Sequence, residues 1–578
     1  MLDLLIRGGQ VIDGTGAPPE RADVGVRAGR VVAIAPPDEG GIDEDAERTI
    51  DADGHVVAPG FVDIHTHYDA QVLWDPATTP SPLHGVTTVV GGNCGFTIAP
   101  VEPSETDYLT RMLARVEGMP LESLIAGVPY DWRTFGEYLD RIDGSIAVNA
   151  GFLVGHSAIR RVVMGDAAVG NEADDEQIAA MRRVLAESIA AGGLGFSSSQ
   201  ATTHNDGDGD PVPSRFATPE ELVALCEVTG QHAGTTLEFI PAVGGFEEKH
   251  LRLMADMSRA ANRPLNWNVL VPNAARADMV WEMLGASDYA AERGGRVLAL
   301  TVPDVMRTHL TFKAGFVFDA LPDWAKTMAL PPDEKMKALA DPAERARLRE
   351  RAASPEAGIF RGLTRWENMT IVETFAPENK DLVGRTVGEI AAERNQDPFD
   401  ALLDIVLLDE LRTVLLPPLA GNDDESWKLR SEVWRDPRAV VGASDAGAHL
   451  DMLSTFTYST AMLRACRERG LMPIEEAVHY LTDVQARLYG LRERGRIAEG
   501  WYADLVVLDA DRVEPAPVEW RNDLPAGAGR LYAEAEGIDH VIVNGVEIVR
   551  GKELTGERPG TLLRSGRDTD TVEAKPAA

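Results

Sequence analysis

The sequence predicts an α/β protein in which a (β/α)8 barrel of the TIM type is joined to a small sheet built from both ends of the chain. Residues 1–57 form short apolar runs separated by glycine and proline turns, a pattern typical of small antiparallel sheets. From about residue 58, β-branched runs alternate with amphipathic stretches at helical spacing. Strand-like runs return at 504–508 and 538–549, where we expect them to complete the N-terminal sheet.

The units of the predicted barrel can be followed along the chain. Residues 86–90 and 146–154 are β-branched or apolar runs, and each ends at a glycine. A helix is expected from about Asp174 to Ala191, because its apolar residues recur at helical spacing and two glycines follow it. In a barrel of this kind, the loops at the C-terminal strand ends carry the chemistry. The series continues with strands at 194–196, 235–240, 264–270, 297–302 and 440–445 and with helices at 220–230 and 247–261.

The same rhythm gives the predicted domain boundaries. Residues 58–490 are expected to form the barrel, and residues 1–57 and 491–564 the two parts of the smaller domain. Residues 565–578 are a polar tail that we expect to be disordered. Between 304 and 385 the alternation fails and the stretch is rich in charge. This insertion is either an elaborated loop over the barrel mouth or a solvated excursion with no role.

Composition narrows the classes of function. The chain has 578 residues, of which 44% are hydrophobic and 26% charged, as in a soluble enzyme. Its net charge of −36 argues against binding to nucleic acid or to an anionic membrane. Its 3 cysteines are too few for a disulfide framework, and the N-terminus lacks a signal peptide. We therefore expect a cytoplasmic protein with a small-molecule substrate. The oligomeric state is not predicted.

Two histidines end the first predicted barrel strand. His65 and His67 follow the apolar run 61–64 at a spacing of i, i+2. Since side chains alternate along a strand, both imidazoles point the same way and can bind one metal ion. The alternative is a pair of solvated histidines at a strand end.

Two further residues are candidates for the same site. Cys94 lies in the glycine-rich turn 92–95 after the second strand, where it is either a small buried hydrophobe or a ligand. Asp445 ends the last strand and is followed closely by His449. Asp445 is either a helix cap or a site residue. For Cys94 and for Asp445 alike, the neighbouring residues favour a role at the site.

Several motifs together resemble the amidohydrolase superfamily. They are the strand and histidine pair at 58–67, the Asn-Cys-Gly turn at 93–95, the strand end at 442–445 and the closing stretch 495–507. Within the superfamily, the Gly-Asn-Cys-Gly-Phe segment at 92–96 and the Gly-His-Ser-Ala-Ile-Arg segment at 155–160 resemble the N-acyl-D-amino-acid deacylases, or D-aminoacylases. The similarity covers nearly the whole chain and is more specific for the superfamily than for the substrate.

The resemblance implies a barrel with a β-sandwich made from both termini and zinc at the C-terminal strand ends. It implies that His65 and His67 are metal ligands and that Cys94 ligates or bridges zinc. Asp445 would be both a ligand and the general base. These roles agree with the chemistry of zinc, which binds nitrogen, thiolate and carboxylate ligands and acidifies a bound water.

The sequence also departs from the family pattern. Histidines are expected at the ends of the fifth and sixth barrel strands, but the matching stretches 234–240 and 263–270 contain none. Glu238 and Asn268 lie at or next to those positions. Glu238 could be a ligand or an acid/base, and Asn268 a hydrogen-bond partner of the substrate. We therefore expect a single zinc ion rather than two. A lysine and a tyrosine expected by the resemblance also have no counterpart at 270–272 and 197–202, so recognition of a substrate carboxylate is in question.

Three other histidines lie in contexts that bear on the site. His156 ends a strand in the matching Gly-His motif, where a substrate contact and a structural hydrogen bond are equally compatible with the pattern. His449 is favoured as a substrate-facing residue. His204 lies on a polar loop and is expected to be solvated.

These observations favour a zinc-dependent hydrolase that cleaves the C–N bond of an N-acylated amine or amino-acid-like small molecule. The missing ligand histidines motivate a second hypothesis, a lyase or isomerase that uses the same metal without hydrolysis. A third is a metal-poor binding scaffold, against which the intact histidine pair and Asp445 argue.

Overall fold

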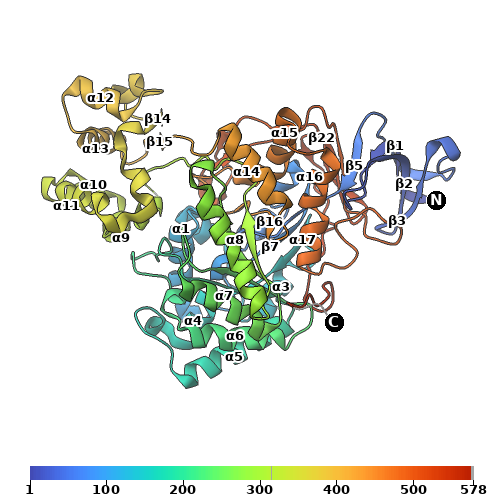
Figure 1. Cartoon of the computed structure of the whole chain (residues 1–578), viewed down its shortest axis with the longest axis horizontal. Helices are drawn as coiled ribbons and strands as arrows, with labels where there is room; N and C mark the ends of the chain where they lie inside the picture. The colour runs from blue at the N-terminus through green and yellow to red at the C-terminus, as the bar shows by residue number, and fades with distance from the viewer. Residues whose placement is uncertain (314–315, 575–578) are drawn as a thin grey trace.

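Parallel strands alternate with helices through the middle of the chain (Figure 1). The structure is a computed structural model that describes residues 1–313 and 316–574. The strands pair in chain order as two parallel sheets, β6-β7-β8 and β9-β10-β11-β12-β13-β16. The predicted α/β class is thereby confirmed. The bounds of these strands are β6 Phe61–Asp63, β7 Val86–Gly91, β8 Asn149–Phe152, β9 Val154–Gly155, β10 Gly195–Ser199, β11 Thr236–Ile240, β12 Leu265–Leu270, β13 Val297–Thr301 and β16 Ala439–Val441.

The two parallel sheets approach each other at both ends. Leu153 alone separates β8 from β9. At the other side, Thr66 forms a parallel bridge with Ala446, and the N–H of His67 donates to the Ala446 carbonyl at 2.7 Å. The C-terminal ends of the first and last strands are therefore adjacent, which brings distant parts of the sequence together at one edge.

Helices follow the strands, and some of them begin at side chains that cap the first turn. Thr134 and Glu137 form a capping box at the start of α3, and Asp174 and Gln177 form one at the start of α5. Several of the helices, among them α8 and α14, pack directly against the parallel strands. The helices are α1 Thr106–Val116, α2 Leu121–Gly127, α3 Phe135–Ile142, α4 His156–Met164, α5 Asp175–Ala190, α6 Pro219–Gly230, α7 Glu248–Ala261, α8 Ala277–Glu292, α14 Asp424–Arg435, α15 Tyr458–Arg469, α16 Ile474–Leu481 and α17 Asp483–Leu488.

A separate sheet combines both ends of the chain. Its strand order is β24-β23-β22-β17-β5-β1-β2-β3, and β4 also pairs with β1. The central joint is antiparallel, with Leu505 of β17 opposite Pro59 of β5. Leu4, Ile6 and Val24 lie in its buried core. The strands are β1 Leu2–Val11, β2 Glu20–Arg27, β3 Arg30–Ala35, β4 Ala46–Asp51, β5 Val56–Pro59, β17 Leu505–Leu508, β22 Ile538–Val543, β23 Val546–Arg550 and β24 Glu553–Leu554. Short pairs are formed by β18 Glu514–Pro515 with β21 Ala535–Glu536, and by β19 Glu519–Arg521 with β20 Arg530–Tyr532.

The charged insertion folds as a lobe with its own apolar core (Figure 1, α9 to α13). Trp324 and Trp366 stack there with ring centroids 5.7 Å apart. The core reaches Leu415, so it extends beyond the end predicted at residue 385. The sequence predicted either an elaborated loop over the barrel mouth or a solvated excursion, because the stretch is rich in charged residues. The elements are α9 Ala325–Met328, α10 Pro332–Ala340, α11 Pro342–Ala353, β14 Thr370–Glu373, α12 Val387–Arg394, α13 Pro398–Leu408 and β15 Val414–Leu416.

The polar C-terminal segment is packed rather than disordered as far as residue 574. The Thr569 hydroxyl donates to the Gly234 carbonyl at 2.6 Å, and the Asp570 N–H donates to the Gly490 carbonyl at 2.7 Å. The prediction of disorder was wrong here because these polar groups find backbone partners on the parallel-strand domain. Residues 575–578 of the predicted tail lie outside the described residues.

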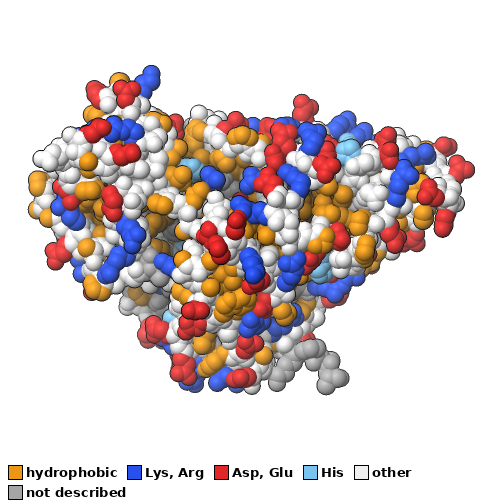
Figure 2. Space-filling model, turned by 45° about the horizontal axis from the view of Figure 1, so that its top comes forward, with side chains coloured by type: hydrophobic (Ala, Val, Ile, Leu, Met, Phe, Trp, Pro, Cys, Tyr) orange, Lys and Arg blue, Asp and Glu red, His pale blue; other side chains and the backbone are white. Residues whose placement is uncertain are grey.

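The surface carries charges of both signs. Figure 2 shows acidic and basic side chains interspersed over the visible face. Within residues 1–313 and 316–574, no helix combines the length and apolarity needed to cross a membrane.

Candidate metal centre

His65 and His67 extend from the end of β6 with their Nε2 atoms on a shared side. The two rings are edge to face, with centroids 5.3 Å apart. Both side chains are buried, at 2% and 3% exposure. Their backbone is held between the neighbouring strand ends, since Thr66 N–H donates to Val90 and His67 N–H donates to Ala446. The i, i+2 spacing thus produces the predicted convergence.

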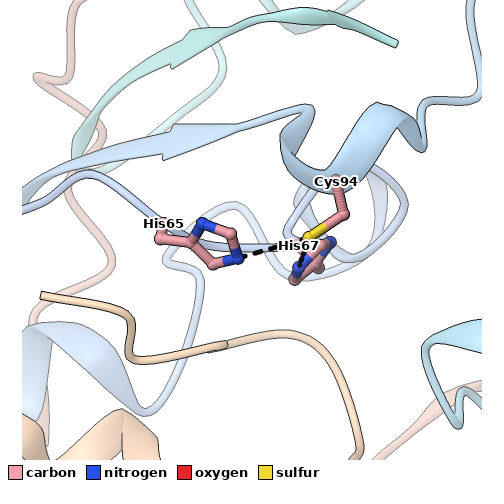
Figure 3. Close-up of side chains that lie close together, drawn as sticks. All are labelled: His65, His67 and Cys94. Carbon is pink, nitrogen blue, oxygen red and sulfur yellow. Dashed lines mark hydrogen bonds between the residues drawn. The ribbon is translucent and has the colours of Figure 1, made fainter. Parts of the chain in front are cut away.

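Cys94 reaches the same point from the loop after β7 (Figure 3). Its Sγ lies 3.5 Å from His65 Nε2 and 3.8 Å from His67 Nε2. Candidate ligand atoms of His65, His67 and Cys94 all lie within 4.8 Å of one another. Two imidazole nitrogens and one thiol sulfur at this separation fit a zinc ion.

Gly92 allows this loop to approach its neighbours. Its φ is +74°, and a Cβ there would lie 2.2 Å from the Leu153 carbonyl oxygen. We expect Gly92→Ala to destabilise the protein by more than the roughly 1–2 kcal/mol of a left-handed residue alone, as measured by chemical denaturation of the metal-free protein. Gly54→Ala is the matched control, because φ is +78° there and nothing lies within 4 Å of the added carbon. Equal losses in the two variants would contradict a role for the close approach.

Asp445 adds a carboxylate from the loop after β16, which lies next to the end of β6. Its Oδ1 lies 3.2 Å from His65 Nε2 and 3.4 Å from His67 Nε2. Burial by itself would raise the pKa of Asp445, but its hydrogen bonds to the two histidines outweigh burial and hold that pKa well below its usual range. Its side chain remains 27% exposed, so water can reach this carboxylate. His65, His67, Cys94 and Asp445 are thus brought together as predicted.

Glu238 contacts the backbone of Cys94, and Asn268 contacts Glu238. Glu238 Oε2 accepts the backbone N–H of Cys94 at 2.8 Å, and its Oε1 accepts a hydrogen bond from the Asn268 amide. Both side chains are buried, Glu238 in the middle of β11 and Asn268 in the second half of β12. The structure therefore brings these two predicted residues to the candidate centre, where each already has a protein partner.

His449 and His204 flank the centre. His449 is 8% exposed, its N–H donates to the Glu117 carbonyl, and burial lowers its pKa to about 4. His204 is also 8% exposed, stacks edge to face on Phe96 at 5.0 Å, and shares a 2.7 Å hydrogen bond with the Ser199 hydroxyl. The prediction that His204 is solvated was wrong, because its polar loop folds inward against the aromatic ring that follows Cys94.

His156 has a different environment from the one required for substrate binding. Its Nδ1 is 2.8 Å from the Ser198 hydroxyl, and its Nε2 is 2.8 Å from Glu221 Oε1. Arg160 also pairs with Glu221, and all these side chains are buried. Both ring nitrogens are thus engaged within the protein, which fits the structural alternative and corrects the proposed substrate contact.

Three buried carboxylates around the histidines were not predicted from the sequence. Asp63 and Asp69 continue the alternation of His65 and His67, a signal that could have identified them. Burial raises the pKa of Asp63 to about 7 and that of Asp69 to about 6. Glu117 Oε1 lies 3.3 Å from His67 Nδ1, but it is far from the ligands in sequence and has no motif. The three side chains make the surroundings of the centre strongly acidic.

Several known proteins are similar to this chain over nearly its whole length. The amidohydrolase family model matches residues 48–549. The D-aminoacylase of Alcaligenes xylosoxydans xylosoxydans is 29% identical over 97% of each chain. The N-acyl-D-glutamate deacylase of Bordetella bronchiseptica, solved with zinc and a phosphonate inhibitor, has a TM-score of 0.66 and 25% identity, covering 98% of this chain and 100% of that one. A D-aminoacylase structure with a binuclear metal centre has a TM-score of 0.65 and 26% identity over the same shares. The resemblance predicted from the motifs is confirmed, and the chain belongs to the amidohydrolase family.

Proposed function

We propose that this protein is a zinc-dependent hydrolase that cleaves the amide C–N bond of an N-acylated amine or amino-acid-like small molecule. The observation that carries the proposal is the convergence of two imidazole nitrogens and a thiol, with the Asp445 carboxylate next to both nitrogens. Nitrogen, sulfur and oxygen donors in this combination suit zinc. The deacylase relatives named above support the choice of an amide as substrate.

In this proposal His65, His67, Cys94 and Asp445 hold the metal. Zinc bound there would supply an acidified water, with a pKa lowered to about 7, as the nucleophile. Asp445 accepts the proton of the attacking water and returns it to the leaving nitrogen, since its carboxylate is charged and accessible to water.

Asn268 is suited to orient the substrate. Its amide nitrogen donates to Glu238, whereas its buried Oδ1 accepts no hydrogen bond from the described residues. A buried acceptor without a partner is costly, so an N–H of the bound substrate would satisfy it. His449 at the rim is the other candidate contact. Its low pKa favours the neutral ring, which can donate or accept a hydrogen bond.

We predict a single tightly bound zinc ion in each chain. Both oxygens of Glu238 are engaged by Cys94 and Asn268, and an asparagine is a poor zinc ligand. One related structure is described by one-metal activation and second-metal attenuation, which supports a single active ion. Elemental analysis after exhaustive dialysis should find about one zinc per chain. Two tightly held ions would mean that Glu238 is released from these partners to complete a second site.

Product analysis in ¹⁸O-labelled water tests the reaction type. The purified, zinc-loaded protein is incubated with a library of N-acylated amines and amino acids. Hydrolysis predicts one solvent oxygen in the released acid, whereas elimination or isomerisation predicts none. Release of unlabelled products by metal-loaded protein would support the lyase or isomerase alternative. No turnover and no metal binding would support the binding scaffold.

We also propose that the two parallel sheets form one closed (β/α)8 barrel over residues 58–490, interrupted by the lobe. Leu153 and the Thr66–Ala446 bridge are the two joints that support closure. Residues 1–57 and 491–564 would form the accessory β-sandwich domain. Its sheet order, in which β17 pairs with β5, supports this division.

A further inference from the structure

A buried carboxylate lies on the far side of His67 from the candidate metal position. Glu117 Oε1 is 3.3 Å from His67 Nδ1, and the two side chains are each 3% exposed. The other ring nitrogen, Nε2, faces Asp445 at 3.4 Å and the Cys94 sulfur at 3.8 Å. Because the two nitrogens lie on different sides of an imidazole, Glu117 contacts the histidine without competing for the metal position.

This arrangement favours a proton on Nδ1 of His67, the nitrogen that faces the Glu117 carboxylate at 3.3 Å. An ionised carboxylate only accepts hydrogen bonds, so a hydrogen bond between the two groups would place the hydrogen on Nδ1. In the neutral ring, Nε2 then presents its lone pair toward Cys94 and Asp445. A carboxylate behind a ligating histidine also fixes the plane of the ring and increases the basicity of the ligand.

His65 provides an internal comparison. Its Nε2 faces the same centre, 3.2 Å from Asp445 Oδ1 and 3.5 Å from Cys94 Sγ. Its Nδ1, however, is buried and has no hydrogen-bond partner among the described residues. The Nε2 atoms of both histidines face the same centre, but only His67 has a carboxylate next to its Nδ1.

Glu117 is itself held rigidly. It follows α1, whose Leu113 and Val116 are buried, and its N–H donates to the Leu113 carbonyl at 2.9 Å. Its own carbonyl accepts the N–H of His449. The next residue, Gly118, has φ +58°, and a Cβ there would lie 3.2 Å from the Cα of His449. The end of α1 is thus fixed between the metal centre and the loop that follows Asp445.

We propose that Glu117 is a positioning residue: its carboxylate accepts the Nδ1–H of His67 and so presents Nε2 to the metal. The inference rests on the proposed metal-dependent function and adds to it a residue that no motif identifies. It predicts that Glu117 contributes to zinc affinity, whereas a purely structural role would change only stability.

The test measures zinc affinity by competition with a chromophoric chelator in the full-length protein. Glu117→Gln removes the charge and keeps the size, and Glu117→Leu removes the acceptor. Asp69→Asn is the matched control, because Asp69 is also a buried carboxylate near His67 but bonds to the Gly92 N–H at 3.0 Å instead. The melting temperature of each metal-free variant reports on its folding.

We expect both Glu117 variants to bind zinc about 10–100-fold more weakly than the wild type, with the leucine variant weaker, and Asp69→Asn to stay within about threefold. If the leucine variant does not fold, the glutamine variant decides the outcome. Affinity within about twofold of the wild type in a folded Glu117→Gln protein would overturn the inference. Equal weakening in Asp69→Asn would also overturn it, because the effect would then come from nearby charge alone. A wild-type protein that binds no zinc would instead contradict the proposed function.

Discussion

Replacing Asp445 with asparagine is expected to lower turnover by about 10²–10⁴-fold, the loss typical of removing a general acid–base. The amide keeps the size of the side chain and an oxygen that can still coordinate, so zinc content should stay near that of the wild type. What the substitution removes is the negative charge and the basicity of the group next to His65 and His67. The measurement pairs kcat on the substrate found by screening with elemental analysis of the same preparation.

Asp451→Asn is the control for this variant, because Asp451 is a carboxylate in the same loop outside the ligand cluster. It should retain most of the activity. The pH dependence gives a second readout. The pKa of Asp445 lies well below its usual range, because its hydrogen bonds to the two histidines outweigh the effect of burial. The wild-type base therefore stays charged as the pH falls, so Asp445 should sustain activity at acid pH, and this acid-side activity should be lost when asparagine replaces it. A variant with half the wild-type turnover and an unchanged profile would leave the mechanism without its base.

Replacing His67 with alanine is expected to remove most of the bound metal and nearly all of the activity. The Nε2 of His67 faces the candidate metal position next to Asp445, and its Nδ1 faces Glu117. Alanine would remove both of these contacts. The fold should persist, because residues at the C-terminal strand ends of this architecture serve the site rather than the core. Zinc content, turnover and circular dichroism of the purified variant check the three parts of this expectation.

The matched control is His250→Ala. His250 lies on α7, outside the ligand cluster, and its replacement should leave metal content and turnover close to wild type. Full activity in a His67→Ala protein that has lost its zinc would contradict the metal assignment.

Local pattern was sufficient to predict that the candidate ligands lie close together. The alternation of side chains along a strand places His65 and His67 on one face. The short glycine-rich turn at 92–95 brings Cys94 to them, and the last strand end contributes Asp445. Because parallel strands end at the same edge, residues at the ends of different strands meet there, which the resemblance and the strand pattern both anticipated.

Contacts between segments that are distant in the sequence could not be predicted from it. Glu117 follows a helix, and only the packing of that helix determines that its carboxylate meets His67. His204 lies in a polar loop, yet tertiary contacts bury its ring against Phe96. His156 ends a strand as the site residues do, but it points to Glu221 and Ser198 instead. In each case the neighbour that decides the role lies far away in the chain.

The zinc K-edge X-ray absorption spectrum of the zinc-loaded protein tests the central claim most directly. A centre held by two histidines, one cysteine and one aspartate predicts a sulfur neighbour at about 2.3 Å together with nitrogen and oxygen neighbours at about 2.0–2.2 Å. The sulfur signal should disappear in Cys94→Ser. A zinc-loaded wild-type protein whose spectrum contains only nitrogen and oxygen neighbours would contradict the assignment of Cys94, and with it the centre proposed here.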